Sequence, residues 1–165
     1  MSVFQTRAVP TPALTMFPAV RGSNLNGRPF ELPGDFEGER NLVILAFQRE
    51  QHALVDSWSP AIANLLARYA DLRFYELPTI RRGNPLFRAW LDSAMRGGIA
   101  DRQARDHTIT LYLDKAAFRE ALGLLHEDTI YLLVLDRGGH VLWRGQGEYT
   151  ERVGRELERV LAEGL

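Results

Sequence analysis

Two uninterrupted apolar segments constrain the fold of this chain more than any other feature. Residues 42–47 read Leu-Val-Ile-Leu-Ala-Phe, residues 130–135 read Ile-Tyr-Leu-Leu-Val-Leu, and neither contains a charged side chain. A strand with one face in solvent alternates apolar and polar residues, whereas an unbroken apolar run of this length is typical of a strand covered on both faces. We therefore expect a sheet whose centre is buried between two layers of helices.

The segment after the first apolar run carries helical periodicity. Apolar residues recur at helical spacing from residue 54 to residue 69, on both sides of Pro60. This unbroken period favours one helix kinked at Pro60 over a helix that starts there with Ser59 as its cap. Residues 72–77 then predict a second strand, ended by Pro78.

The other expected elements rest on turn, cap and periodicity signals. They are a hairpin around Asn26-Gly27, a helix over residues 86–95 after Asn84-Pro85, a strand over 108–113, a helix over 115–122 between Asp114 and Gly123, an antiparallel strand pair joined by residues 136–139, and a helix over 150–162.

This element order predicts the α/β fold class. We expect a three-layer α/β/α sandwich with a mixed central sheet and an N-terminal hairpin extension. The length of 165 residues fits one domain. Because Pro10 and Pro12 disfavour regular structure near the start, we expect an N-terminal arm over residues 1–16 and a single domain over residues 17–165.

The chain contains no cysteine. Thiol peroxidases, disulfide exchangers, thiolate zinc sites and iron–sulfur proteins all need a sulfur nucleophile or ligand, so thiol-dependent oxidoreductase or peroxidase activity is excluded. The four histidines share no ligand spacing, and no phosphate-binding glycine motif is present. We therefore expect no metal and no cofactor.

Charge and hydropathy limit the partners and the compartment. With 20 basic and 21 acidic residues the formal net charge is -1, which gives no general attraction to nucleic acid. The apolar runs are too short to span a bilayer, so no stable membrane insertion is expected. The first twenty residues have neither a signal-peptide core nor a transit helix, and the predicted location is cytoplasmic.

The pattern of elements resembles the thioredoxin-like superfamily, in the peroxiredoxin-type form. The features that carry the resemblance are the hairpin at Asn26-Gly27, the strand-helix-strand start with a helix interrupted at Pro60, and the closing strand-strand-helix unit. The resemblance implies that residues 48–53 form the loop in which relatives keep a reactive thiol. It also implies a cis-proline before the closing hairpin, where this chain has Asp128-Thr129-Ile130.

Within that superfamily the sequence is most similar to the family of assembly factors of the mitochondrial ATP synthase. The similarity rests on residues 55–58 followed by Pro60, and on residues 131–136 with residues 141–143 and Gly147. It implies a role in building the membrane sector of that enzyme, whose subunits would then be the partners.

Two groups of residues are candidate sites. The loop after the first core strand and the helix that follows offer a candidate binding loop, in which His52 is suited to acid–base chemistry near neutral pH: Arg49, Glu50, Gln51, His52, Asp56 and Trp58. Arg81, Arg82 and Arg88 form a candidate patch for an anion or an acidic partner, or else a solvated arginine-rich face.

These features predict a non-catalytic protein that binds another protein, as an assembly factor or chaperone. The alternative is a thiol-free relative of the peroxiredoxins that catalyses an unknown reaction with the loop from Arg49 to His52.

Overall fold

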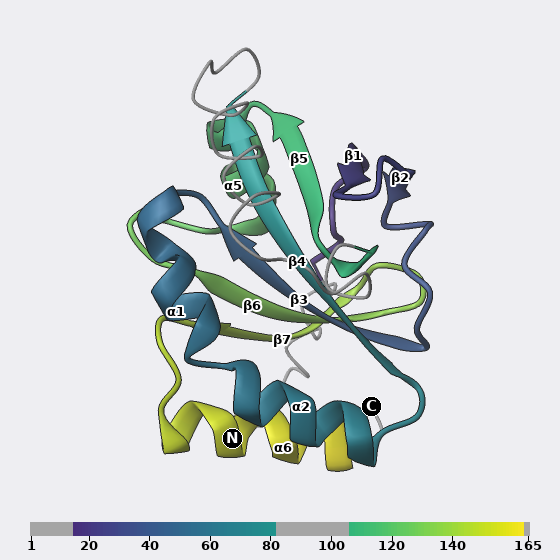
Figure 1. The fold of residues 1–165 in the computed structure, drawn as a ribbon, viewed down its shortest axis with the longest axis vertical. Coiled ribbons are helices and arrows are strands. Elements are labelled where there is room, and N and C mark those ends of the chain that lie inside the picture. Colours follow the sequence, from purple (N-terminus) through teal and green to yellow (C-terminus); the bar gives the residue numbers. More distant parts are fainter. Residues whose placement is uncertain (1–14, 82–105, 164–165) are drawn as a thin grey trace, which may run out of the picture.

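A computed structural model describes residues 15–81 and 106–163 and shows a seven-stranded mixed sheet with helices on both faces (Figure 1). The spatial strand order is β2-β1-β5-β4-β3-β6-β7. The strands are β1 (Val20–Asn24), β2 (Pro29–Leu32), β3 (Arg40–Ala46), β4 (Leu72–Arg81), β5 (Ile109–Leu113), β6 (Tyr131–Asp136) and β7 (Val141–Gln146). The helices are the short 3₁₀ turn η1 (Arg49–Gln51), α1 (His52–Asp56), α2 (Ser59–Arg68), α5 (Lys115–Leu122) and α6 (Glu151–Ala162).

Two apolar clusters, one on each face of the sheet, hold the layers together. On one face α1, α2 and α6 pack against Leu42, Ile44 and their neighbours through Trp58 and Leu157. On the other face α5 contributes Phe118 and Leu122, which join Val43 and Leu45. The three-layer sandwich expected from the sequence is confirmed.

Strand β3 lies inside the sheet, between β4 and β6, as its apolar run predicts. Leu42, Val43, Ile44 and Leu45 are all fully buried. β3 pairs in parallel with β4 on one side and antiparallel with β6 on the other, which makes the sheet mixed.

The prediction that Pro78 ends the second core strand is wrong, because β4 continues to Arg81. Pro78 lies opposite Ala46, where the ladder with β3 ends. From Thr79 onward β4 pairs with β5 instead. The sheet tolerates the missing N–H of proline because it falls where β4 changes partners.

The prediction of one kinked helix across Pro60 is also wrong. The structure has two helices, α1 and α2, separated by Ser57 and Trp58, both of which keep right-handed helical dihedrals. Pro60 occupies the second position of α2, and since it has no N–H, the hydrogen-bond ladder breaks just before it. Trp58, and not Ser59, is the residue that precedes the first turn of α2.

Caps and turns that the sequence predicts are confirmed in both halves of the chain. The Asp114 side chain accepts a hydrogen bond from the N–H of Ala117 at the start of α5, and Gly123 ends that helix with a φ of 68°. The Thr150 side chain caps α6 in the same way. The tight turn of the β1–β2 hairpin contains Gly27 with a φ of 83°.

Two predicted elements lie wholly or mostly outside the described ranges: the helix over residues 86–95, and the N-terminal arm over residues 1–16, of which only residues 15 and 16 are described. Thr15 and Phe17 make backbone hydrogen bonds to Val141 and Gly139 at the β6–β7 turn, so the chain is paired from the first described residue. In the two described ranges we find no helix long and apolar enough to cross a membrane.

Candidate functional site

Gln51 closes the loop that follows β3. Its side-chain oxygen accepts hydrogen bonds from the N–H groups of Phe47 at 2.8 Å and Gln48 at 3.2 Å. Its amide nitrogen donates to the carbonyl oxygen of Glu127 at 2.6 Å. The side chain is buried and joins the β3–α1 loop to the loop before β6. Because three hydrogen bonds satisfy this amide, it serves the fold and is not offered to a ligand.

Trp58 is also part of the core. It is fully buried, and its indole nitrogen donates a hydrogen bond to the carbonyl oxygen of Gly147 at 2.9 Å. The ring of Tyr149 lies edge-on against it, with 5.1 Å between the ring centroids. Gln51 and Trp58 therefore face inward, and neither contributes to an exposed binding surface.

The remaining residues of the candidate loop are exposed. Arg49, Glu50 and His52 lie at the turn η1 and the start of α1, and Asp56 lies at the end of α1. The Nε2 atom of His52 is 3.5 Å from an oxygen of Asp56, and both side chains are more than 60% exposed. The two residues lie one helical turn apart on α1, and Asp56 lines a groove between α2 and β4.

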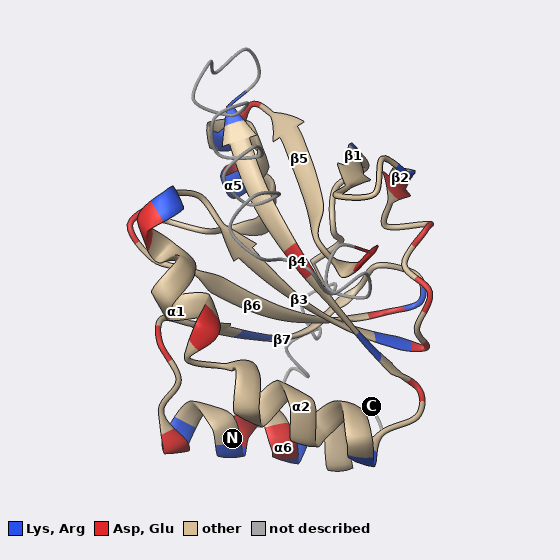
Figure 2. Ribbon diagram, in the orientation of Figure 1, with Lys and Arg blue, Asp and Glu red and all other residues tan. Residues whose placement is uncertain are grey.

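Glu76 is the titratable residue of this groove that the sequence analysis did not single out. It lies in the middle of β4, where Figure 2 shows an acidic position among uncharged residues. Burial raises the pKa of its carboxyl; the negative charge of Asp56 raises it further, while the charge of His52 lowers it. The alternation along β4 could have found it, since Leu72, Phe74 and Glu76 share one face of the strand.

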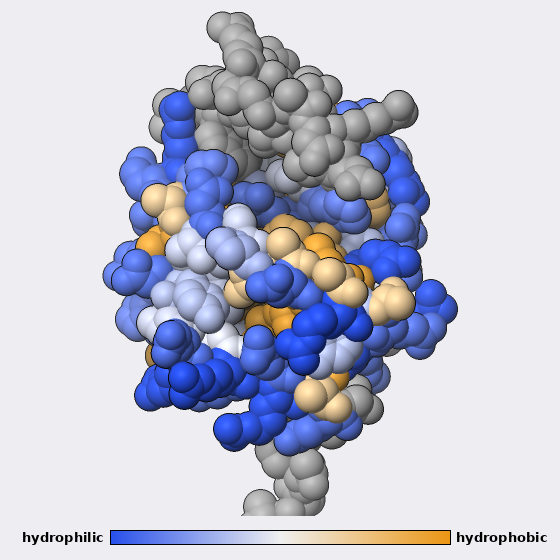
Figure 3. All heavy atoms as spheres, turned by 60° about the horizontal axis from the view of Figure 1, so that its bottom comes forward, coloured by the Kyte–Doolittle hydropathy of each residue, from blue (hydrophilic) through white to orange (hydrophobic). Residues whose placement is uncertain are grey.

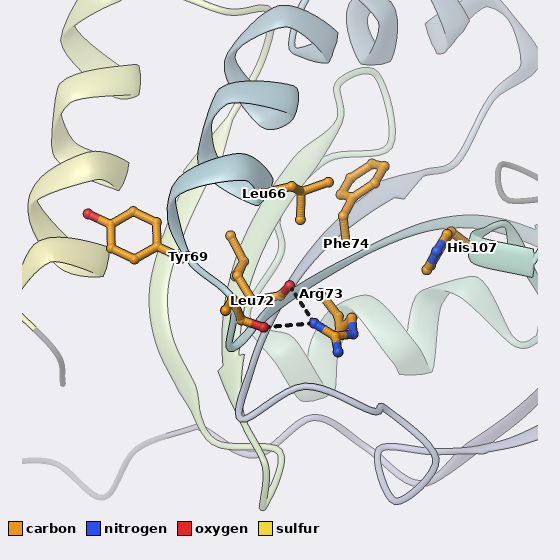
Figure 4. Close-up of a pocket in the computed structure, with 7 residues that line it drawn as sticks. Leu66, Tyr69, Leu72, Arg73, Phe74 and His107 are labelled. Carbon is orange, nitrogen blue, oxygen red and sulfur yellow. Dashed lines mark hydrogen bonds between the residues drawn. The ribbon is translucent and has the colours of Figure 1, made fainter.

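The groove consists of two adjoining hollows. The first, called the acidic hollow, has a volume of about 260 Å³ and is lined by Val55, Asp56, Ser59, Ile62, Ala63, Leu66, Phe74 and Glu76. The second, called the Tyr69 hollow, has a volume of about 220 Å³ and is lined by Leu66, Tyr69, Ala70, Leu72, Arg73, Phe74 and His107. Leu66 and Phe74 line both hollows. Figure 4 shows their side chains among those that line the Tyr69 hollow.

The surface around the groove combines apolar and charged residues. Figure 3 shows an apolar area enclosed by hydrophilic residues on the face that carries the helices α2 and α6. Leu66 of α2 is 39% exposed, a high value for a large apolar side chain. Contiguous apolar surface with a polar rim is typical of sites that bind a ligand or another protein.

The candidate arginine patch is only partly described. Arg81 is exposed at the end of β4, and Arg82 and Arg88 lie outside the described residues. Within those ranges no three His, Asp or Glu side chains come together as a metal site requires.

Comparison with known proteins identifies the fold. The chain matches no protein-family model and no curated protein. It superposes on the thioredoxin domain of a thiol-disulfide oxidoreductase from Bacteroides vulgatus with a TM-score of 0.58 and 16% identity, covering 89% of this chain and 96% of that one. The fold is thioredoxin-like.

Two other structures support the same assignment. The exposed lipoprotein thioredoxin Etrx1 of Streptococcus pneumoniae aligns with a TM-score of 0.54 and 12% identity, covering 88% of this chain and 99% of that one. A thiol:disulfide interchange protein from Bacteroides sp. aligns with a TM-score of 0.55 and 13% identity, and 88% of each chain is covered. This thioredoxin-like chain shares their fold but contains no cysteine.

Proposed function

We propose that this thioredoxin-like protein binds another protein and does not carry out thiol chemistry. The observation that carries the proposal is the Gln51 bridge. In the loop where the thioredoxin-like resemblance places a reactive thiol, this chain has an amide that is held by three hydrogen bonds and is only 3% exposed. The loop is thereby fixed as a structural element.

The surface between α2 and β4 supports a binding role. Leu66 and Phe74 present apolar surface there, and the exposed side chain of Asp56, which lies 3.5 Å from His52, belongs to the same groove. Burying such surface against a partner is the main favourable term in protein association. The resemblance to the ATP synthase assembly factors that we infer from residues 55–58 with Pro60, and from the closing hairpin with Gly147, makes subunits of the membrane sector of that enzyme the first partners to test.

The decisive experiment is affinity purification from the native cell, with cytoplasmic and membrane fractions treated separately and bound proteins quantified by mass spectrometry. We expect wild-type protein and Leu125→Asp to retain the same partner, and Leu66→Asp to lose it. Leu125 is the matched control because it is 79% exposed and lies away from the groove, in the loop before β6.

Two results would contradict the proposal. One is the absence of any partner that is enriched with wild type and lost with Leu66→Asp. The other is turnover of a peroxide, a disulfide or another small substrate by the purified protein at enzyme-like rates. Recovery of ATP synthase membrane subunits would support the narrower assembly-factor role, and recovery of unrelated proteins would exclude it.

A second candidate function is catalysis by the exposed pair of His52 and Asp56. The 3.5 Å separation of Nε2 from the Asp56 carboxylate lets the carboxylate orient the imidazole for proton transfer. If a substrate screen detects an activity, His52→Ala and Arg49→Ala should abolish it. An activity that survives both substitutions would remove this candidate.

A further inference from the structure

We propose that the acidic hollow receives a lysine or arginine side chain of the bound protein, while the Tyr69 hollow receives an apolar side chain next to it. The inference rests on the proposed protein-binding function and specifies the chemistry of the partner. The partner segment is thus a peptide in which a basic residue is accompanied by a large apolar one.

The size and lining of the acidic hollow fit one long basic side chain. Its volume of about 260 Å³ is below the roughly 300 to 1,000 Å³ typical of small-molecule sites. Ile62, Leu66 and Phe74 provide apolar walls, and the carboxylates of Asp56 and Glu76 lie in the same hollow. Lysine and arginine have the matching form, because an apolar stem carries their charged head group.

The charges around Glu76 select for a cation. No side chain in the described ranges donates a hydrogen bond to the Glu76 carboxylate, which lines the acidic hollow together with Asp56 of α1. The charged neighbours that face it are Asp56 and His52, both from α1, and the residues that α2 contributes to the hollow are uncharged. Glu76 is half-buried, and a carboxylate removed from water is costly unless it is paired, so a cationic head group would supply a partner that we do not find among the described residues.

The Tyr69 hollow is suited to the neighbouring apolar residue. Leu66, Leu72 and Phe74 line it together with Tyr69 and His107, and it shares Leu66 and Phe74 with the acidic hollow. The guanidinium of Arg73 is directed to the carbonyl oxygens of Ala70 at 3.0 Å and Leu72 at 3.2 Å, so this charge is turned toward the backbone (Figure 4). The two hollows together therefore present one acidic and one apolar position.

Selection from a display library of random linear peptides tests the proposal directly. We expect the enriched peptides to carry Lys or Arg beside Leu, Ile, Phe or Trp. Glu76→Gln should weaken their binding at least about tenfold, because the cationic head group then enters a hollow that has lost a charge partner. Glu148→Gln, which alters an exposed carboxylate before α6, should leave the affinity unchanged.

A double-substitution cycle isolates the charge pair. Replacing the basic residue of a selected peptide with norleucine, which keeps the stem and removes the charge, should abolish the difference between wild type and Glu76→Gln. Benzoylphenylalanine at position 66 should cross-link the peptide. The thermal unfolding midpoint of each variant verifies that it is folded. Asp56→Asn, which removes the other carboxylate of the acidic hollow at an exposed position, should also weaken binding of the peptide.

Several outcomes would overturn the inference. They are enriched peptides without a basic residue, equal affinities of wild type and Glu76→Gln, or a cross-link from position 66 to a second copy or to another part of the same chain. If the cellular partner binds wild type and Glu76→Gln equally, the protein-binding function stands and the assigned chemistry fails. If wild type retains no partner at all, the proposed function itself fails.

Discussion

The indole nitrogen of Trp58 donates a hydrogen bond to the carbonyl oxygen of Gly147, 89 residues further along the chain. A second bond runs beside it, from the N–H of Tyr149 to the hydroxyl oxygen of Ser57 at 2.9 Å. The two bonds attach the junction of α1 and α2 to the loop between β7 and α6. The break in the helix before Pro60 is thus fixed by contacts with the C-terminal unit.

Replacing Trp58 with Phe should test this attachment. The change keeps an aromatic ring in the core but leaves the Gly147 carbonyl without its donor, so we expect a loss of about 1–3 kcal/mol in the free energy of unfolding. Urea unfolding measures it, and Trp143→Phe at a half-buried position of β7 is the control. Equal losses in the two variants would show that ring volume, and not the hydrogen bond, determines the stability.

The reactivity of cysteines introduced into the loop after β3 should show whether this loop is closed to solvent. Position 51 is buried, whereas the side chain of His52 next to it is 63% exposed. We expect Gln51→Cys to react with Ellman's reagent at least about tenfold more slowly than His52→Cys, because thiol reactivity requires access. Equal rates in the folded protein would show that position 51 is not enclosed once the hydrogen bonds of the Gln51 side chain are removed.

The stability of the protein should depend on the ionisation of Glu76. Its pKa is raised in the folded state, so the fold favours the protonated form. The contribution of protonated Glu76 to the free energy of unfolding is fully present below the ordinary carboxyl pKa of about 4.3. It is lost as the pH rises through the raised pKa of the folded state. Glu76→Gln should therefore be more stable than wild type at neutral pH and no more stable near pH 4. A gain that does not change with pH would contradict the burial of this charge.

Asp71 should show the opposite dependence. A hydrogen bond from Arg40, with Nε 2.7 Å from the carboxylate, lowers the pKa of Asp71. Its contribution is present above the unfolded pKa of about 3.9 and is lost as the pH falls through the lowered value. Asp71→Asn should cost less than about 1 kcal/mol at neutral pH, since the carboxylate is 38% exposed, and nothing in strong acid. Asp128→Asn, at an exposed loop position, should cost nothing at either pH.

Local signals in the sequence were enough to predict most of the fold. The apolar run in β3, the Asp114 cap and the glycine at position 123 each act within a few residues, and each is found where expected. The errors at Pro60 and Pro78 have a common cause. The effect of a proline depends on whether the backbone at that position would otherwise donate a hydrogen bond, and the acceptor of that bond is set by tertiary structure.

The candidate site was harder to predict, because a polar side chain can bind a ligand only if it is exposed, and burial depends on contacts that are distant in the sequence. Gln51 and Trp58 have polar groups that could serve a ligand, but their hydrogen-bond partners, Glu127 and Gly147, lie 76 and 89 residues away. Glu76 could have been found from the alternation along β4, but its place in a groove becomes apparent only when residues of α1 and α2 are seen to line the same hollow.

The change of partners along β4 divides the sheet into two ladders that share one strand. Leu72–Pro78 pairs with β3, whereas only Thr79, Ile80 and Arg81 pair with β5 within the ladder, joined by an isolated bridge between Glu76 and Thr108. In native-state hydrogen exchange we expect the amides of β1, β2 and β5 to exchange together, at a lower opening free energy than those of β3 and β6. Part of the sheet would then open separately from the rest, and the boundary in β4 lies between Pro78 and Thr79, just beyond Glu76, which lines the groove.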